Sequence, residues 1–177
     1  MNTRQRICLF LYYHFAIHLP ASYQVGGRLS KSFRYALCKR LFKHCGQNVN
    51  IEKGARFGTG QNVCVDDNSG IGINADIPDG THIGKNVMMG PNCYVIGINH
   101  KFERLDIPMC NQGYVHTKPL IIEDDCWIGR DVLITGGRTI HKGTIIAARS
   151  VLTKDYPDYS IVGGNPARLI KSRLLDK

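Results

Sequence analysis

The amino-acid sequence predicts a mainly β protein whose central part is a parallel β-helix, a rod of stacked three-sided coils. The first indication is an aliphatic residue at every sixth position between residues 65 and 153, with one interruption. The two runs are Val65, Ile71, Ile77, Ile83, Met89 and Val95, and then Ile122, Ile128, Ile134, Ile140, Ile146 and Leu152. A period of six fits neither an amphipathic α-helix nor one face of a flat sheet, but it fits a coil in which each hexad forms one side.

The second indication is a small or slender residue four positions after most of these aliphatic residues. These residues are Ser69, Ala75, Thr81, Val87, Cys93, Cys126, Val132, Thr144 and Ser150. Three hexads close one triangular coil, so each residue stacks on the residue 18 positions later, at the strand spacing of about 4.8 Å. The aliphatic side chains then point into the rod, and the second inward side chain of each hexad stays small because the bore is narrow.

Residues 1–47 are expected to form a basic helical segment. Residues 1–50 contain eight Arg and Lys residues and no Asp or Glu, so the rest of the chain carries only +1 of the net charge of +9. The apolar stretch 7–19 is too short and too polar for a bilayer span, and it lacks the cleavage site of a signal peptide. Phe33, Leu37 and Leu41 instead indicate an amphipathic helix between residues 31 and 45.

Two interpretations of this segment remain open. In the first, it covers the open end of the β-helix. In the second, residues 1–45 make a peripheral contact with an anionic membrane surface. Because the positive charge is confined to this segment, the composition does not indicate a nucleic-acid-binding protein. Seven cysteines without a C-x-x-C pair indicate no disulfide framework, which favours a cytoplasmic location, at the inner face of the membrane if the second interpretation holds.

Residues 48–165 are assigned to the β-helix, and one long insertion interrupts them. After Val95 the next inward residue is due at position 101 but occurs at Ile122, so residues 101–121 are expected to form an ejected loop. Loops that leave a regular scaffold often carry binding or catalytic residues. His100 stands at the foot of this loop and is the first candidate for chemistry.

Residues 166–177 are expected to form a short C-terminal helix and a tail. Pro166 suits the first position of a helix over residues 167–175. Such a helix would close the far end of the bore with its apolar residues, and it would place Arg168 and Lys171 on one face.

Five short motifs occur along the chain in a fixed order. They are residues 83–92 (IGKNVMMGPN), the pair Asn99 and His100 before a long loop, residues 125–129 (DCWIG), residues 153–155 (TKD) and residues 162–171 (VGGNPARLIK). In this set the chain resembles the hexapeptide-repeat acyltransferases, and most closely the branch of galactoside, maltose and capsular-polysaccharide O-acetyltransferases. The resemblance implies a left-handed β-helix, a homotrimer, and acetyl-CoA bound in a groove between neighbouring β-helices.

The resemblance also implies roles for individual residues. His100 would act as the general base on a saccharide hydroxyl, free or lipid-linked, in surface-polysaccharide assembly, because an imidazole titrates near neutrality. Asn74 would orient the acceptor or stabilise the oxyanion. The acetyl group would pass directly in a ternary complex. The contacts to acetyl-CoA would come from Trp127, Gly129, Ala148, Lys154, Arg168 and Lys171, the three cations lying near its phosphates.

Three positions depart from the family pattern, namely Arg138, His141 and Arg149. Arg138 stands in an inward slot that is usually slender, which predicts a distorted or solvated corner. Two other functions remain open. One is a zinc enzyme like the γ-type carbonic anhydrases, which needs three converging imidazoles; the other is a non-catalytic oligomerisation scaffold. The coils contain no H-x₄-H pair, so no metal is expected.

Overall fold

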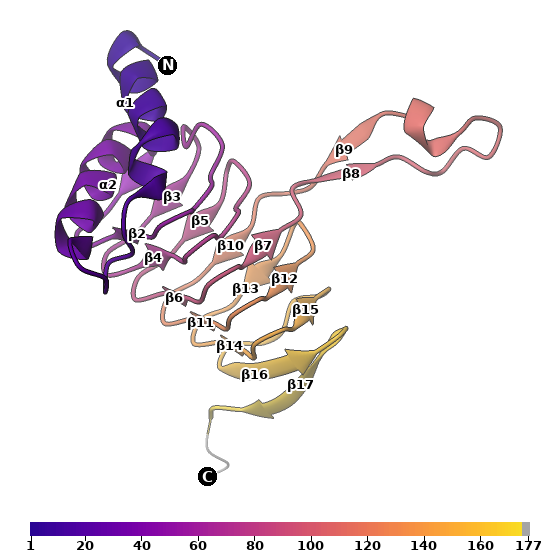
Figure 1. Ribbon diagram of the computed structural model, residues 1–177. Helices are drawn as coiled ribbons and strands as arrows, with labels where there is room; N and C mark the ends of the chain where they lie inside the picture. Colours follow the sequence, from indigo (N-terminus) through magenta and orange to yellow (C-terminus); the bar gives the residue numbers. More distant parts are fainter. Residues whose placement is uncertain (175–177) are drawn as a thin grey trace.

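The computed structural model describes residues 1–174, and it confirms a mainly β protein built around a parallel β-helix (Figure 1). Helices lie at the N-terminal end of the rod, one long hairpin projects from its middle, and a second hairpin ends it. The helices are α1 (Thr3–His14), η1 (Ala16–His18), α2 (Gly27–Leu41) and η2 (Met109–Asn111). The strands are β1 (His44–Cys45), β2 (Asn50–Ile51), β3 (Cys64–Val65), β4 (Gly70–Ile71), β5 (His82–Ile83), β6 (Met88–Met89), β7 (Tyr94–Val95), β8 (Ile98–His100), β9 (Tyr114–His116), β10 (Ile121–Ile122), β11 (Trp127–Ile128), β12 (Leu133–Ile134), β13 (Thr139–Ile140), β14 (Ile145–Ile146), β15 (Val151–Leu152), β16 (Ser160–Gly164) and β17 (Ala167–Ser172).

Short strands form the three faces of the rod. The first face has the order β1, β3, β5, β10, β13, and the third has the order β7, β12, β15. The second face starts with β2 and β4, which lie beside β6, and continues through β11, β14 and β16. Within each face these strands are parallel, and their register places Val65 opposite Ile83 and Ile128 opposite Ile146. The stacking of residues 18 positions apart is therefore confirmed.

The bore is packed as the hexad pattern predicts. The aliphatic residues of the two runs are buried, apart from the half-buried Met89, and so are the small residues four positions after them. The Ser69 hydroxyl donates to the carbonyl of Gly84 and accepts the N–H of Val87, so this buried polar group is satisfied. Burial raises the pKa of the Cys93 and Cys126 thiols to about 11, which makes them inert core residues rather than nucleophiles.

Several corners of the coils require a left-handed backbone. Asn and Asp tolerate this conformation better than other residues with side chains, and they hold most of the positive-φ corners. These are Asn48, Asn68, Asn74, Asn86, Asn92, Asp125 and Asp131, with Arg149 (φ 59°) and Tyr159 as the exceptions. Asn74 Nδ2 donates to Asn92 Oδ1 at 3.2 Å, and Asn92 Nδ2 donates to Asp131 Oδ1 at 2.8 Å. One row of corners is thus joined along the rod by a ladder of side-chain hydrogen bonds. Arg138, half-buried, donates from Nε to Thr135 Oγ1 at a corner of another row.

The N-terminal helices pack against the first coil. The Tyr12 hydroxyl of α1 donates to the Ala55 carbonyl at 2.8 Å, and its ring lies 4.6 Å from that of Phe57. On α2, Leu37 and Leu41 are buried, whereas Phe33 remains 40% exposed. The helices therefore cover the inward residues that the first coil would otherwise expose. Within residues 1–174, no helix combines the length and the apolar character that crossing a membrane demands.

Arg34 of α2 connects the helical segment to the first coil. Its side chain is fully buried, and its guanidinium donates to the carbonyls of Ile51 at 2.6 Å and Pro20 at 3.1 Å, with longer bonds to the carbonyls of Ala16 and Leu19. Glu52 lies 3.8 Å from it. Burial alone would raise the pKa of Glu52, but hydrogen bonds from Ser22 and Asn50 and the charge of Arg34 together lower it. The buried positive charge of Arg34 is therefore paired with Glu52, and its N–H groups donate to backbone carbonyls.

The insertion forms a projecting β-hairpin. Its strands are β8 and β9, with the short helix η2 near the tip, and the β-helix resumes at β10. The inserted chain leaves the rod slightly earlier than residue 101, because β8 already begins at Ile98. His100 consequently belongs to the hairpin itself and not to the last coil.

The prediction of a C-terminal helix is wrong. Residues 167–172 form β17, which pairs antiparallel with β16. A helix of nine residues is marginal by itself, whereas the free edge of β16 offers a row of backbone hydrogen-bond partners. Pairing along that edge therefore decides the conformation of this segment. The last residue of the predicted helix, Leu175, and the rest of the tail lie outside the described residues.

We predict that Arg34→Ala destabilises the protein strongly. The substitution leaves buried carbonyls without a donor and Glu52 without its partner, which typically costs about 3 kcal/mol or more. Thermal unfolding followed by circular dichroism measures the loss. Arg28→Ala, on the exposed side of the same helix, is the matched control. A loss no larger than that of the control would contradict the connecting role of Arg34.

Candidate active site

His100 lies on one face of the projecting hairpin, together with three other side chains. In the register of β8 and β9, Ile98 is opposite His116 and His100 is opposite Tyr114. Directly opposed residues, and residues two apart on one strand, share a face. The imidazole ring of His100 packs against the Tyr114 ring with 4.6 Å between the centroids. All four residues are exposed, so the His100 ring is held by a neighbour while remaining accessible to a ligand.

A cavity of about 540 Å³ lies at the base of this hairpin. Its lining includes Ile98 and His116 from the hairpin and Asp76, Asp79 and Tyr94 from the coils. His100 itself does not line the cavity, but Ile98 and His116 share its face of the hairpin. The lining offers carboxylates, a phenol and an imidazole as hydrogen-bonding groups, which suits a ligand rich in hydroxyl groups.

Asp76, Asp79 and Tyr94 belong to no motif that the sequence displays, and only the structure brings them to this cavity. Burial raises the pKa of Asp76, and the charge of nearby Arg56 opposes this shift. Asp76 and Tyr94 each precede an inward residue of the third face. A parallel β-bridge joins their backbones between neighbouring coils. The signal that marks Asp76 and Tyr94 in the sequence is their outward position in the hexad pattern, close to the insertion.

Asn74, the second residue predicted to act on the acceptor, lies at a corner of the rod next to the N-terminal helices. It lines a second cavity of about 380 Å³, together with His18 and Arg56 from the N-terminal side, and Asp76 and Tyr94 line both cavities. Its amide nitrogen already donates to Asn92 in the corner ladder. Within one chain, Asn74 therefore does not line the cavity at the base of the hairpin, although it lines the second cavity, which shares Asp76 and Tyr94 with the first.

A second group of candidate residues lies on the second face. Trp127 is half exposed and lies opposite Met88 on one side and Ile145 on the other. Ile145 in turn lies opposite Ile161. The next outward row consists of small residues, Gly90, Gly129, Ala147 and Gly163, by continuation of the same register. A Cβ on Gly129 would lie 2.6 Å from the backbone nitrogen of Ala148, so only glycine fits there. The indole of Trp127 therefore lies beside a row of residues with little or no side chain, which leaves room for an extended ligand.

Two of the three predicted cations lie on this same face. Lys171 pairs with Ile161 and Arg168 pairs with Gly163, on either side of a bulge. Because Ile161 and Gly163 are two apart on β16, both cations share the outward face even though the predicted helix is absent. Lys154 does not join them, since it follows β15 of the third face and its ammonium lies 5.3 Å over the Tyr156 ring.

The two groups of candidate residues lie on different sides of the rod. The hairpin leaves at the corner after β7 of the third face, and Trp127 stands on the second face. Figure 1 shows the hairpin pointing away from the column of β6, β11 and β14. One chain alone therefore does not bring His100 to Trp127.

Comparisons with known proteins agree with this architecture. No protein-family profile matches the chain. The crystal structure of a hexapeptide-repeat acetyltransferase from Vibrio cholerae superposes with a TM-score of 0.77 at 29% identity, over 97% of this chain and 93% of that one. The galactoside O-acetyltransferase of Escherichia coli is 31% identical over 140 residues, which cover 78% of this chain and 68% of that protein. The chain belongs to the hexapeptide-repeat acetyltransferases. This membership confirms the predicted fold class, a left-handed parallel β-helix of hexapeptide repeats.

Two further comparisons bear on this family assignment. The Vibrio cholerae acetyltransferase has also been solved in complex with acetyl-CoA, and that structure aligns over 94% of this chain and 87% of its own at 26% identity and a TM-score of 0.53. A probable acetyltransferase of Mycobacterium tuberculosis is 36% identical over 93 residues. The chain spans only 31% of that longer protein.

Proposed function

We propose that this protein transfers an acetyl group from acetyl-CoA to a hydroxyl of a saccharide acceptor, with His100 as the general base. The observation that carries the proposal is the exposed imidazole of His100 on a hairpin whose base lines a polar cavity. The galactoside O-acetyltransferase relative and the acetyl-CoA complex of the Vibrio cholerae protein support the choice of acceptor and donor. Membership of this family favours acetyl transfer over the zinc-enzyme and scaffold interpretations.

The chemistry requires a base but no protein nucleophile. A sugar hydroxyl attacks the thioester carbonyl as the His100 imidazole takes its proton. The resulting tetrahedral oxyanion collapses, the carbon–sulfur bond breaks, and the imidazolium returns the proton to the leaving thiolate of CoA. The ester and free CoA are the products. The Tyr114 ring limits the rotation of the imidazole and so favours one orientation of the base. Asn74 would contribute a hydrogen bond to the acceptor through the amide proton that Asn92 leaves free.

Acetyl-CoA fits the second face. Its pantetheine arm would lie on the row of small residues at Gly129 and Ala147, next to the exposed Ala148, with the indole of Trp127 along one side. Arg168 and Lys171 at the end of this row would bind its phosphates. The register separates Trp127 from Lys171 by three strand steps, about 14 Å, so the arm has an extended path between them. Lys154 could join this site only from a neighbouring copy.

A homotrimer would bring the His100 hairpin and the proposed acetyl-CoA site on the second face together. Since His100 and Trp127 lie on different sides of one rod, the hairpin of one copy must reach the second face of the next. A closed ring of three such contacts gives three equivalent sites. The protein then acts as an obligate oligomer, and each site takes residues from two copies.

The N-terminal segment would bring the protein to its acceptor. Residues 1–45 are basic and carry exposed apolar side chains at Ile7, Phe10 and Phe15. This combination favours peripheral contact with an anionic membrane, and a lipid-linked saccharide at the cytoplasmic face would be the natural acceptor. Surface-polysaccharide O-acetylation is the process that we propose.

We predict that His100→Ala lowers kcat by about 10²- to 10⁴-fold, the usual contribution of general-base catalysis. The affinity for acetyl-CoA should change little, because the second face is untouched. Release of free CoA thiol with galactoside and maltoside acceptors measures the rate, and calorimetry measures binding. His82→Ala, on the first face, is the control. A variant that keeps full kcat would remove His100 from the mechanism.

We also predict that CoA binding weakens as salt rises and that Arg168→Ala and Lys171→Ala each raise the Kd by about tenfold, since each removes a charge-assisted hydrogen bond. In both variants the salt dependence should become shallower. Titration calorimetry at several salt concentrations tests this, with Arg28→Ala at the opposite end of the rod as the control. Unchanged affinity and slope in both variants would disprove phosphate binding by this pair.

A further inference from the structure

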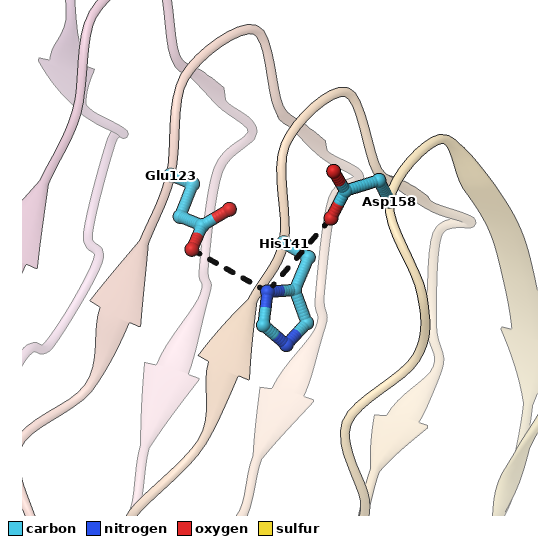
Figure 2. A group of neighbouring side chains, drawn as sticks. All are labelled: Glu123, His141 and Asp158. Atoms are coloured by element: carbon cyan, nitrogen blue, oxygen red, sulfur yellow. Dashed lines mark ion pairs between the residues drawn. The ribbon is translucent and has the colours of Figure 1, made fainter.

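A histidine and two carboxylates converge at one corner of the rod, between the first and second faces. Glu123 and His141 directly follow the inward Ile122 and Ile140, and Asp158 lies on the next coil, two residues after Tyr156. The potential ligand atoms of Glu123, His141 and Asp158 all lie within 4.8 Å of one another. Figure 2 shows His141 between the two acids, with the Nδ1 edge of the ring turned toward both carboxylates. The Nδ1 atom lies 3.4 Å from Glu123 Oε1 and 3.9 Å from Asp158 Oδ1.

These distances differ from those of an ordinary hydrogen-bonded ion pair. On the same corner of the rod, His44 Nε2 approaches Asp66 Oδ1 to 2.9 Å, the normal length of a direct N–H···O bond. His141 remains farther from both of its acids. Two ligand atoms of one zinc ion, each bound at about 2.0 to 2.1 Å, lie about 3.4 Å apart in tetrahedral geometry. The contact between His141 and Glu123 already has this length.

Glu123 is held in the orientation that such a site needs. Its Oε2 accepts the backbone N–H of Lys142 at 2.9 Å, which leaves Oε1 directed at the imidazole. Hydrogen bonds of this kind fix a ligating carboxylate from behind. Asp158 is the most exposed of the three, and a small rotation of its side chain brings its oxygen to ligand distance.

We propose that Glu123, His141 and Asp158 bind a divalent transition-metal ion, of which Zn²⁺ is the best match. One imidazole and two carboxylates form a ligand set that suits zinc better than magnesium or calcium, which prefer oxygen ligands alone. The three side chains are only partly exposed, so water completes the coordination sphere while solvent ions still reach the site. The ion joins three consecutive coils on the side toward the C-terminal end of the rod. It lies apart from His100, so its role is structural and does not depend on the proposed acetyl transfer.

The experiment is equilibrium dialysis of the untagged protein against Zn²⁺, with bound metal measured per chain. We expect His141→Ala to bind one ion fewer per chain than the unsubstituted protein. Asp158→Asn, a conservative change at an exposed position, should also bind one ion fewer. This second variant keeps the test valid if His141→Ala folds poorly. His44→Ala, which removes the hydrogen-bonded histidine, should bind as much zinc as the unsubstituted protein.

Thermal unfolding gives an independent readout. Zinc at about 100 times its Kd should raise the Tm by about 5 to 10 °C, and this rise should be absent in His141→Ala and Asp158→Asn. Equal zinc uptake by all the variants, or a Tm that zinc does not change, would overturn the proposal. In that case His141 is a polar neighbour of the two acids and no metal ligand.

Discussion

The registered stacking of coils 18 residues apart is the constraint on which the rest of the structure depends. Each inward aliphatic side chain lies on its equivalent in the next coil, as Ile128 lies on Ile146. Because backbone hydrogen bonds join these levels, no residue can move along the rod without disturbing the coil above or below it. This fixes every outward side chain in a row, at about 4.8 Å per step. Both the column that contains Trp127 and the corner that holds His141 are such rows.

The same constraint underlies our proposal that the chemistry involves two copies. A rigid three-sided rod cannot fold one face onto another, so outward side chains in the middle of different faces do not meet within one chain. The hairpin that carries His100 leaves at the corner opposite the face that carries Trp127. The hairpin is long enough to leave its own rod altogether (Figure 1). In the account that we propose, the insertion supplies the base to a neighbour, and the regular coils supply a straight path for acetyl-CoA.

Much of the fold could be predicted because inward positions repeat. The period of six located the coils, and its interruption after Val95 located the hairpin. The prediction of a C-terminal helix failed because pairing with the edge of β16 outweighed the local helix signal. The segment that contains Arg168 and Lys171 is therefore the strand β17. Those two cations still share a face, but a β-bulge places them there. The period also could not show that the amide of Asn74 serves a corner ladder, because this depends on the neighbouring coil.

Several site residues were hidden in the sequence for a related reason. Asp76 and Tyr94 are 18 residues apart, and Glu123, His141 and Asp158 are spaced by 18 and 17, so none forms a compact motif. Outward residues are free of the packing constraint that makes inward ones recognisable. Only the coil register brings them together, which is why the cavity and the proposed zinc site emerged from the structure.

The most direct test of the account is complementation between two inactive variants. His100→Ala lacks the base, and the double variant Arg168→Glu, Lys171→Glu lacks the proposed phosphate contacts; each should be inactive alone. If every site takes His100 from one copy and the second face from the next, random mixed trimers of the two chains contain one intact site in four, so activity should recover to about a quarter of normal. Mixed trimers no more active than their parents would contradict a site shared between copies.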